Sequence, residues 1–343
     1  MNQANGEIKK SGKGEWSDAL RFFPSDLRQI LAKAPAEVQS KLIEVRIRVN
    51  RPLELNFGRY SSLITPDGDL TTDCRRAVIN GVEDLRKTIN ALTTGSLYAL
   101  ENELVQGYLA LPGGHRVGVT GQVIYDGVKI STIRNISSIN FRIARAVTGI
   151  ARPVLPFLWK GKRFLKTLII GPPATGKTTL LREIIREVSS GVPSLGIPGI
   201  HVGLVDERSE IAGSYRGIPQ LDVGLRTDVL DGCSKRDGVY LLLRAMNPQL
   251  IATDEIGRED DIRVIEDIIN AGVSFIATAH ARNLTEAMLR PGLQRILRAG
   301  MVERVVVVGN SLGIGTVESI KAGINGPELL SAPGLTEVRE CSN

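Results

Sequence analysis

The segment Gly171-Pro172-Pro173-Ala174-Thr175-Gly176-Lys177-Thr178-Thr179 constrains the fold of this sequence more than any other feature. It follows an apolar run at residues 168–170, which is typical of a buried strand. It also opens a segment, residues 180–188, whose apolar side chains recur at helical spacing. Strand, Gly-x-x-x-x-Gly-Lys-Thr and helix in this order indicate a phosphate-binding loop. The alternative is an ordinary Gly/Pro turn, and the agreement between the loop and its flanking elements disfavours it.

Each residue type in this loop has a chemical reason. Glycines allow backbone N–H groups to surround a phosphate, and the helix N-terminus adds partial positive charge. We expect Lys177 to be a solvated cation that reaches the β- and γ-phosphates, and the Thr178 hydroxyl to bind Mg²⁺. The sequence therefore predicts a nucleoside triphosphate site for ATP and Mg²⁺ at residues 171–179.

Composition limits the class of protein. The length of 343 residues favours two domains, and the 42% hydrophobic and 23% charged shares are those of a soluble globular protein. No apolar run reaches the length of about 18 residues that a transmembrane helix requires. The three cysteines show no C-x-x-C spacing, which favours a reducing cytoplasm over a disulfide framework or a zinc site.

The charge is unevenly distributed along the chain. Residues 1–163 carry a net charge of +9 and residues 164–343 a net charge of −3. The basic half is suited to nucleic acid, an acidic partner protein or an anionic membrane surface, and merely solvated charge is the alternative.

The changes of pattern along the chain predict five segments. We expect a polar tail, an α+β N-terminal domain, a linker, a phosphate-loop domain and a C-terminal tail, at residues 1–24, 25–150, 151–163, 164–325 and 326–343.

The N-terminal domain mixes strand and helix patterns. Alternating apolar residues predict strands at 44–49, 53–57 and 138–143, and helical spacing predicts helices at 82–92 and 97–104. Asp126-Gly127 is a hairpin-turn signal between strands at 116–125 and 128–133.

In the second domain, apolar strands alternate with helices. The strands are expected at 165–170, 201–205, 250–253, 273–278 and 304–309. This alternation predicts an α/β fold with a mostly parallel sheet, whose ligands bind beyond the carboxyl ends of the strands.

Polar residues follow three of these strands, and we expect them to converge beside the phosphate loop. Asp254 is placed to organise Mg²⁺. Glu207 and Glu255 remain alternatives for the base that activates water, and His280 is placed to sense the γ-phosphate. Acidic residues that merely begin loops, and a buried structural histidine, are the alternatives.

In this order the strand ends resemble the secretion and type IV pilus ATPase branch of the RecA-like P-loop NTPases. Residues 243–257, with Leu-Arg, a proline, an apolar strand and Asp254-Glu255, resemble the second nucleotide motif of that family. Residues 277–281 resemble its histidine box, and residues 205–210 resemble its acidic box without the usual proline. The resemblance implies a RecA-like core.

Three further stretches resemble the stage III sporulation protein AA family. They lie at residues 111–118, 205–213 and 222–232, and the likeness extends over about residues 20–315. This resemblance implies a cytoplasmic ATPase of the mother cell that serves a membrane-embedded, channel-like sporulation complex.

The resemblance to secretion ATPases also implies a hexameric homo-oligomer in which arginines complete the nucleotide sites. The candidates are Arg142, Arg145 and Arg226, with Arg116 behind them, and ordinary surface charge is the alternative. Arginine suits the role because its planar fork binds two phosphate oxygens at once.

Three functions therefore compete. The leading hypothesis is a motor ATPase that acts on protein or membrane-complex partners. A nucleic-acid-dependent NTPase is the second, but the aromatic share of only 4% disfavours a base-stacking surface. The third is a slow nucleotide switch.

Overall fold

The computed structural model describes residues 13–58, 60–93, 105 and 107–332. The chain divides into two compact units. The N-terminal unit extends to Ala146 and includes Gly213–Gln220, and the C-terminal unit contains Val147–Ala212 and the chain from Leu221 onward.

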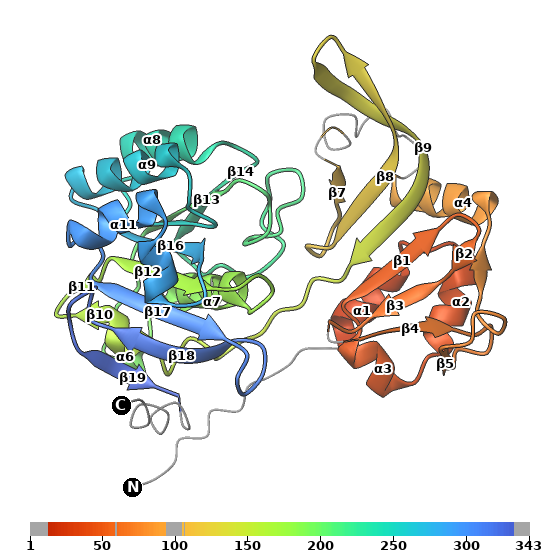
Figure 1. Ribbon diagram of the computed structural model, residues 1–343, viewed down its shortest axis with the longest axis horizontal. Coiled ribbons are helices and arrows are strands. Elements are labelled where there is room, and N and C mark those ends of the chain that lie inside the picture. The colour runs from red at the N-terminus through yellow and green to blue at the C-terminus, as the bar shows by residue number, and fades with distance from the viewer. Residues whose placement is uncertain (1–12, 59, 94–104, 106, 333–343) are drawn as a thin grey trace, which may run out of the picture. The chain divides into compact units, whose positions relative to one another are not determined.

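The N-terminal unit is built on an antiparallel sheet of seven strands in the order β5-β4-β3-β1-β9-β8-β7 (Figure 1). Helices cover one face of it, and Val45 and Ile47 of β1 point into that core. The other face carries Arg46 and Arg48, because successive side chains of a strand point to opposite faces. The elements are α1 (Lys13–Leu20), α2 (Ser25–Lys33), α3 (Ala36–Lys41), β1 (Glu44–Arg48), β2 (Arg51–Pro52), β3 (Glu54–Asn56), β4 (Ser61–Ile64), β5 (Leu70–Thr71), β6 (Ile79–Asn80), α4 (Val82–Leu92), β7 (Tyr108–Ala110), β8 (Arg116–Asp126) and β9 (Lys129–Arg142).

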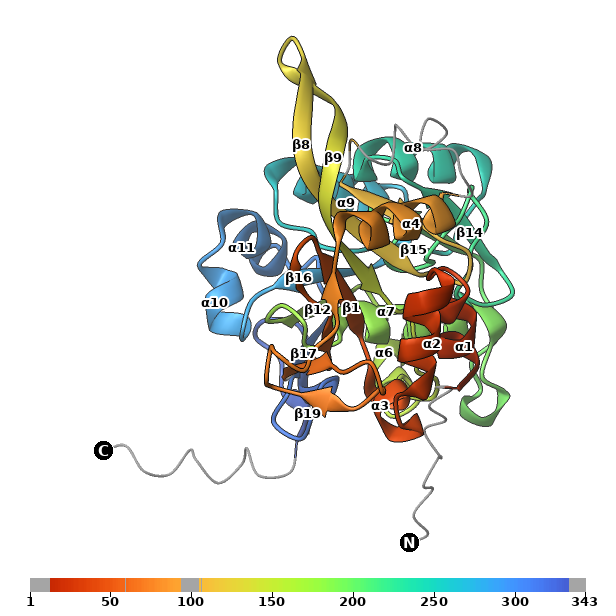
Figure 2. The same ribbon diagram turned by 90° about the vertical axis from the view of Figure 1, so that its right-hand side faces the viewer.

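The structure corrects two expectations for this unit. The expected polar tail contains α1, whose Trp16 is 2% exposed and belongs to the hydrophobic core. The strands expected separately at 128–133 and 138–143 form one strand, β9, whose pairing with β8 continues past a register shift. The far half of this β8–β9 ribbon extends beyond the other strands of its sheet (Figures 1 and 2). The helix expected at 97–104 lies outside the described residues.

The C-terminal unit contains an eight-stranded sheet in the order β14-β13-β15-β16-β12-β17-β18-β19. The first six strands in this order are parallel to one another. β18 pairs antiparallel with β17, and β19 pairs antiparallel with β18. The predicted mostly parallel α/β sheet is therefore confirmed. Helix α7 packs on one face through Leu181 and Ile184, and α8, α9 and α11 pack on the other. With both faces covered, the central strands are buried along their whole length, as in β12 and β13, where all five residues are buried.

The elements of this unit are α6 (Leu155–Leu158), β10 (Trp159–Lys160), β11 (Arg163–Phe164), β12 (Thr167–Gly171), α7 (Lys177–Ser190), β13 (Val202–Asp206), β14 (Thr227–Asp231), α8 (Lys235–Ala245), β15 (Leu250–Thr253), α9 (Glu259–Asn270), β16 (Ser274–His280), α10 (Leu284–Met288), α11 (Pro291–Arg298), β17 (Arg304–Gly309), β18 (Thr316–Lys321) and β19 (Glu328–Ser331).

Two segments expected outside the folded domains belong to this unit. The expected linker at 151–163 contains α6, and its Leu155 and Leu158 lie in the core beneath the sheet. The expected C-terminal tail contains β19, which pairs with β18. Local composition did not reveal either segment, because its few apolar residues pack into a core whose other members come from the whole unit.

Candidate nucleotide site

The phosphate loop connects β12 to α7 with a tightly wound backbone. Ala174 and Gly176 have φ angles of 59° and 89°. A Cβ atom on Gly176 would lie 3.1 Å from the Cα of Gly315, so the position is both strained and crowded for any other residue. The Thr175 hydroxyl donates a 2.8 Å hydrogen bond to the Pro172 carbonyl and closes the loop on itself. The loop ends on the N-terminus of α7, where unpaired N–H groups favour anions.

The side chain of Lys177 lies across this loop and is not solvated as expected, because only 5% of the residue is exposed. Its Nζ donates to the Pro172 carbonyl at 2.8 Å and lies 3.1 Å from Nδ1 of His280. Burial lowers the pKa of Lys177, and the negative charges of Asp254 and Glu255 act in the opposite direction. These two contacts therefore hold the Lys177 ammonium group against the phosphate loop.

Asp254 lies directly after β15 and connects three elements. Its Oδ2 accepts a 2.7 Å hydrogen bond from the Thr178 hydroxyl at the start of α7, and its Oδ1 accepts one from the Thr278 hydroxyl of β16. A carboxylate beside a hydroxyl is the oxygen donor set that Mg²⁺ prefers, with substrate phosphates supplying further ligands. The residues present therefore fit a magnesium ion, and they are the two that the sequence predicted for it.

Glu255, the next residue, has a left-handed backbone with φ of 48°. Two hydrogen bonds hold this conformation, because its N–H donates to the Thr278 hydroxyl at 2.9 Å and to the Asp254 carboxylate at 3.0 Å. The Glu255 carboxylate lies 3.1 Å from Nε2 of His280 and 3.0 Å from a guanidinium nitrogen of Arg208. The strained backbone therefore directs this carboxylate toward the histidine at the end of the neighbouring strand.

The hydrogen-bond pattern assigns a tautomer to His280. A lysine ammonium only donates, so Nδ1 of His280 accepts from Lys177. Nε2 then carries the proton of the neutral ring and donates it to Glu255. Lys177, His280 and Glu255 thus form a continuous hydrogen-bonded chain.

The acidic residues at the end of β13, Asp206 and Glu207, face other partners. Asp206 is 2% exposed, and its carboxylate accepts the backbone N–H groups of Glu210, Ile211 and Ala212. Burial raises the pKa of Asp206 to about 6, and those N–H donors oppose the rise. The Glu207 carboxylate forms an ion pair with Lys235 of α8. Asp206 therefore organises its own loop, and Glu207 is bound to a cation.

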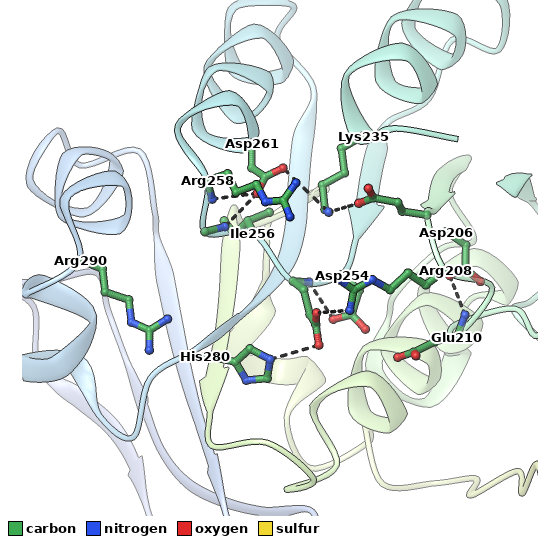
Figure 3. A pocket seen from close by; sticks show the side chains of 13 residues that line it. Asp206, Arg208, Glu210, Lys235, Asp254, Ile256, Arg258, Asp261, His280 and Arg290 are labelled. Atoms are coloured by element: carbon green, nitrogen blue, oxygen red, sulfur yellow. Dashed lines mark hydrogen bonds and ion pairs between the residues drawn. The ribbon is translucent and has the colours of Figure 1, made fainter. Parts of the chain in front are cut away.

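The ends of β13, β15 and β16, with the residues that follow them, line a pocket of about 200 Å³. Four cationic residues that the sequence analysis did not single out line the pocket, and Figure 3 shows them around the acidic strand ends: Arg208, Lys235, Arg258 and Arg290. Arg258 lies shortly after the strand predicted at 250–253, which is a usable signal, whereas Lys235 follows β14, a strand that the sequence analysis did not predict. Arg290 lies between α10 and α11 and has no local signal.

The predicted arginines have different surroundings. Arg145 donates to the carbonyl oxygens of Gln39 and Leu42 inside the N-terminal unit, and Arg226 donates to the carbonyl of Ser189 at the end of α7. Both arginine side chains therefore bind backbone carbonyl groups of their own unit.

Arg142 and Arg116 lie on neighbouring strands of the N-terminal sheet, where their positions pair with each other. The Arg142 side chain is 56% exposed and has an ion pair with Glu44. The guanidinium of Arg116 lies 3.9 Å from the ring centroid of Tyr108.

Comparisons with known proteins identify one family over most of the chain. The family model described as Sporulation stage III, protein AA matches residues 15–325. Stage III sporulation protein AA of Bacillus subtilis is 40% identical over 304 residues, which cover 89% of this chain and 94% of that protein. Protein SEEDLING PLASTID DEVELOPMENT 1 of Arabidopsis thaliana is 30% identical over 185 residues, 52% of this chain but only 25% of that protein.

Solved structures support the fold. The X-ray structure of the Legionella pneumophila ATPase DotB matches with a TM-score of 0.54 at 18% identity, covering 84% of this chain and 76% of that one. The crystal structure of the pilus retraction motor PilT with bound ADP matches with a TM-score of 0.51 at 12% identity, covering 78% and 74%. The C-terminal unit thus has the RecA-like fold that the sequence predicted. No helix among the described residues is long and apolar enough to cross a membrane.

Proposed function

Since this chain belongs to the sporulation stage III, protein AA family, we propose that it is a magnesium-dependent ATPase, a ring-forming motor for a membrane-embedded sporulation complex. The observation that carries the proposal is the hydrogen-bonded chain from Lys177 through His280 to Glu255, beside the Thr178–Asp254 pair. This chain joins the cation of Lys177, the hydrogen-bond donor His280 and the carboxylate of Glu255 at one edge of the sheet. These are the parts that phosphoryl transfer to water requires.

In this proposal the residues of the loop bind the triphosphate. Backbone N–H groups at the start of α7 bind phosphate oxygens, and Lys177 exchanges the Pro172 carbonyl for the β- and γ-phosphates. Asp254 and Thr178 hold Mg²⁺, which when bound neutralises charge on the phosphates.

Glu255 takes the proton of the attacking water. Its carboxylate is held by His280 on one side and Arg208 on the other, so its orientation is set before substrate arrives. His280 reports on the γ-phosphate, because a phosphate that recruits Lys177 removes the donor to Nδ1. Both glutamates pair with a cation, Glu255 with Arg208 and Glu207 with Lys235. Glu255 is also hydrogen-bonded to His280, so Glu207 is the weaker alternative for the base.

The assembly part of the proposal rests on the family. We infer a hexameric homo-oligomer in the cytoplasm of the mother cell, docked on membrane partners. Arg142 is our candidate for the arginine that completes a neighbouring site, because it is on a strand and its side chain is 56% exposed. Its planar guanidinium can bind two phosphate oxygens at once.

The test is ATP hydrolysis by the full chain with and without Mg²⁺, for wild type, Lys177→Ala and Lys162→Ala. Lys162 is an exposed lysine of the same unit and serves as the matched control. We expect magnesium-dependent turnover in wild type and Lys162→Ala and background turnover in Lys177→Ala. Near-normal turnover in Lys177→Ala would contradict the site. Strong stimulation by DNA or RNA would favour a nucleic-acid-dependent NTPase instead.

A further inference from the structure

The turn between β17 and β18, residues 310–315, exposes two large aliphatic side chains. Leu312 is 71% exposed and Ile314 is 57% exposed. The turn itself is held firmly, because Ser311 donates to the Glu318 carboxylate through its N–H at 3.0 Å and its hydroxyl at 2.7 Å. The Thr316 hydroxyl donates to the Gly313 carbonyl at 2.7 Å. The two apolar side chains therefore project from an ordered turn.

This turn touches the phosphate loop directly. The N–H of Gly315 donates to the Thr175 carbonyl at 2.9 Å. A Cβ atom built on Gly176 would lie 3.5 Å from Cγ2 of Ile314. The side chain of Ile314 is thus adjacent to the last residue before α7.

The two flanks of the phosphate loop differ in polarity. In the sheet, β12 lies between β16 and β17. The flank of β16 carries His280, with Asp254 and Glu255 beyond it, directly after the neighbouring strand β15. The flank of β17 leads into the turn with Leu312 and Ile314. A nucleoside triphosphate has the same asymmetry, with charged phosphates at one end and a flat aromatic base at the other.

We propose that Leu312 and Ile314 form the surface that binds the base of the nucleotide. The inference rests on the proposed function, because it takes the phosphates to lie on residues 171–179. The two aliphatic side chains contact the face of the base, and the gain comes from removing apolar surface of both partners from water. Single exposed apolar residues are common on protein surfaces, but here two lie in one turn bonded to the phosphate loop.

The test compares two probes, MgATP and magnesium tripolyphosphate, which carries the phosphates without a base. Equilibrium binding is measured for wild type, for the double variant Leu312→Ser/Ile314→Ser, and for Leu241→Ser. Leu241 is 55% exposed on α8 and controls for the loss of an exposed leucine. We expect the double variant to bind ATP at least about tenfold more weakly and tripolyphosphate within about twofold of wild type.

The other possible results distinguish failure of this inference from failure of the proposed function. Unchanged ATP affinity in the double variant would place the base elsewhere. If the double variant bound both probes more weakly to the same degree, the turn would only support the phosphate loop. That result would also overturn the proposal. A wild-type protein that binds neither probe would contradict the proposed function itself.

A second variant gives a spectroscopic readout. Leu312→Trp places an indole where the base is expected to stack. ATP should change its fluorescence and tripolyphosphate should not. The same response to both probes would contradict a base at this position.

Discussion

Nε2 of His280 lies 3.1 Å from Oε1 of Glu255, while Nδ1 of the same ring lies 3.1 Å from Nζ of Lys177. One imidazole therefore connects the cation of the phosphate loop to the carboxylate proposed as base. Because a neutral ring has one donor and one acceptor nitrogen, a change at one end of the chain alters the hydrogen bond at the other. In the proposed function, this relationship would couple phosphate binding to water activation.

The first prediction separates the two glutamates. Glu255→Gln keeps the size of the side chain and removes its ability to take a proton. We expect it to bind ATP normally and to hydrolyse it at least about 10²-fold more slowly, the scale of general base catalysis. Glu207→Gln, whose parent carboxylate pairs with Lys235, is expected to retain most activity. Single-turnover hydrolysis with bound-nucleotide analysis measures both, and the reverse ranking would reassign the base to Glu207.

The second prediction concerns Asp254. Asp254→Asn removes a charge beside Thr178 but keeps a polar side chain of similar size. We expect the Mg²⁺ concentration for half-maximal hydrolysis to rise about tenfold or more, because Mg²⁺ is held by few protein ligands. A magnesium titration at saturating ATP checks this. An unchanged magnesium dependence would show that the metal lies elsewhere.

The third prediction concerns Arg142 and assembly. An arginine that stabilises the transition state is worth roughly 10³–10⁵ in rate, so Arg142→Ala should be nearly inactive. If Arg142 acts in a neighbouring subunit, mixing Arg142→Ala with inactive Lys177→Ala should restore part of the activity, because some interfaces then contain both groups. Arg134→Ala, an exposed arginine of the same strand, is the control and should be active alone.

Mixtures that stay inactive despite demonstrated co-assembly would exclude a trans role for Arg142. The same mixing with Arg145→Ala and Arg226→Ala tests the other candidates. We expect those two variants to lose stability as well, because each removes hydrogen bonds to backbone carbonyls.

The fourth prediction concerns pH and the N-terminal unit. His115 is 1% exposed, and its Nδ1 accepts the N–H of Ala144. Burial, with the charge of Arg21, lowers the pKa of His115 to about 4 from its ordinary 6.5. The unfolded chain thus binds a proton that the folded chain does not, between pH 6.5 and 4. Stability should be retained above pH 6.5 and should fall, by at most about 1.4 kcal/mol per pH unit, as the pH decreases through this window.

Urea unfolding in a Trp159→Phe background measures this, because Trp16 then reports on the core of the N-terminal unit. His115→Asn keeps a hydrogen-bond acceptor and does not titrate, so its stability should change less over the same window. Identical pH slopes for the histidine and asparagine proteins would assign the effect to other groups.

The sequence by itself determined the elements whose signals are local. The nine residues from Gly171 to Thr179 specify the loop, since glycine, lysine and threonine are needed there at fixed spacing. Runs such as residues 168–170 identify buried strands, and their alternation with amphipathic helices implies a parallel sheet. Because parallel strands end at one edge, the meeting of Asp254 and His280 near Lys177 also followed from order alone.

Only the tertiary structure decided where individual side chains point and which distant segments pack together. Glu207 and Glu255 have the same chemistry and similar sequence context, yet one pairs with Lys235 and the other with His280. Lys177 is buried because His280 and the Pro172 carbonyl close around it. Segments such as α1 and β19 fold because their apolar side chains pack into cores to which the whole of each unit contributes. A local pattern encodes the period of an element, but burial and orientation depend on contacts that form only when the chain is folded.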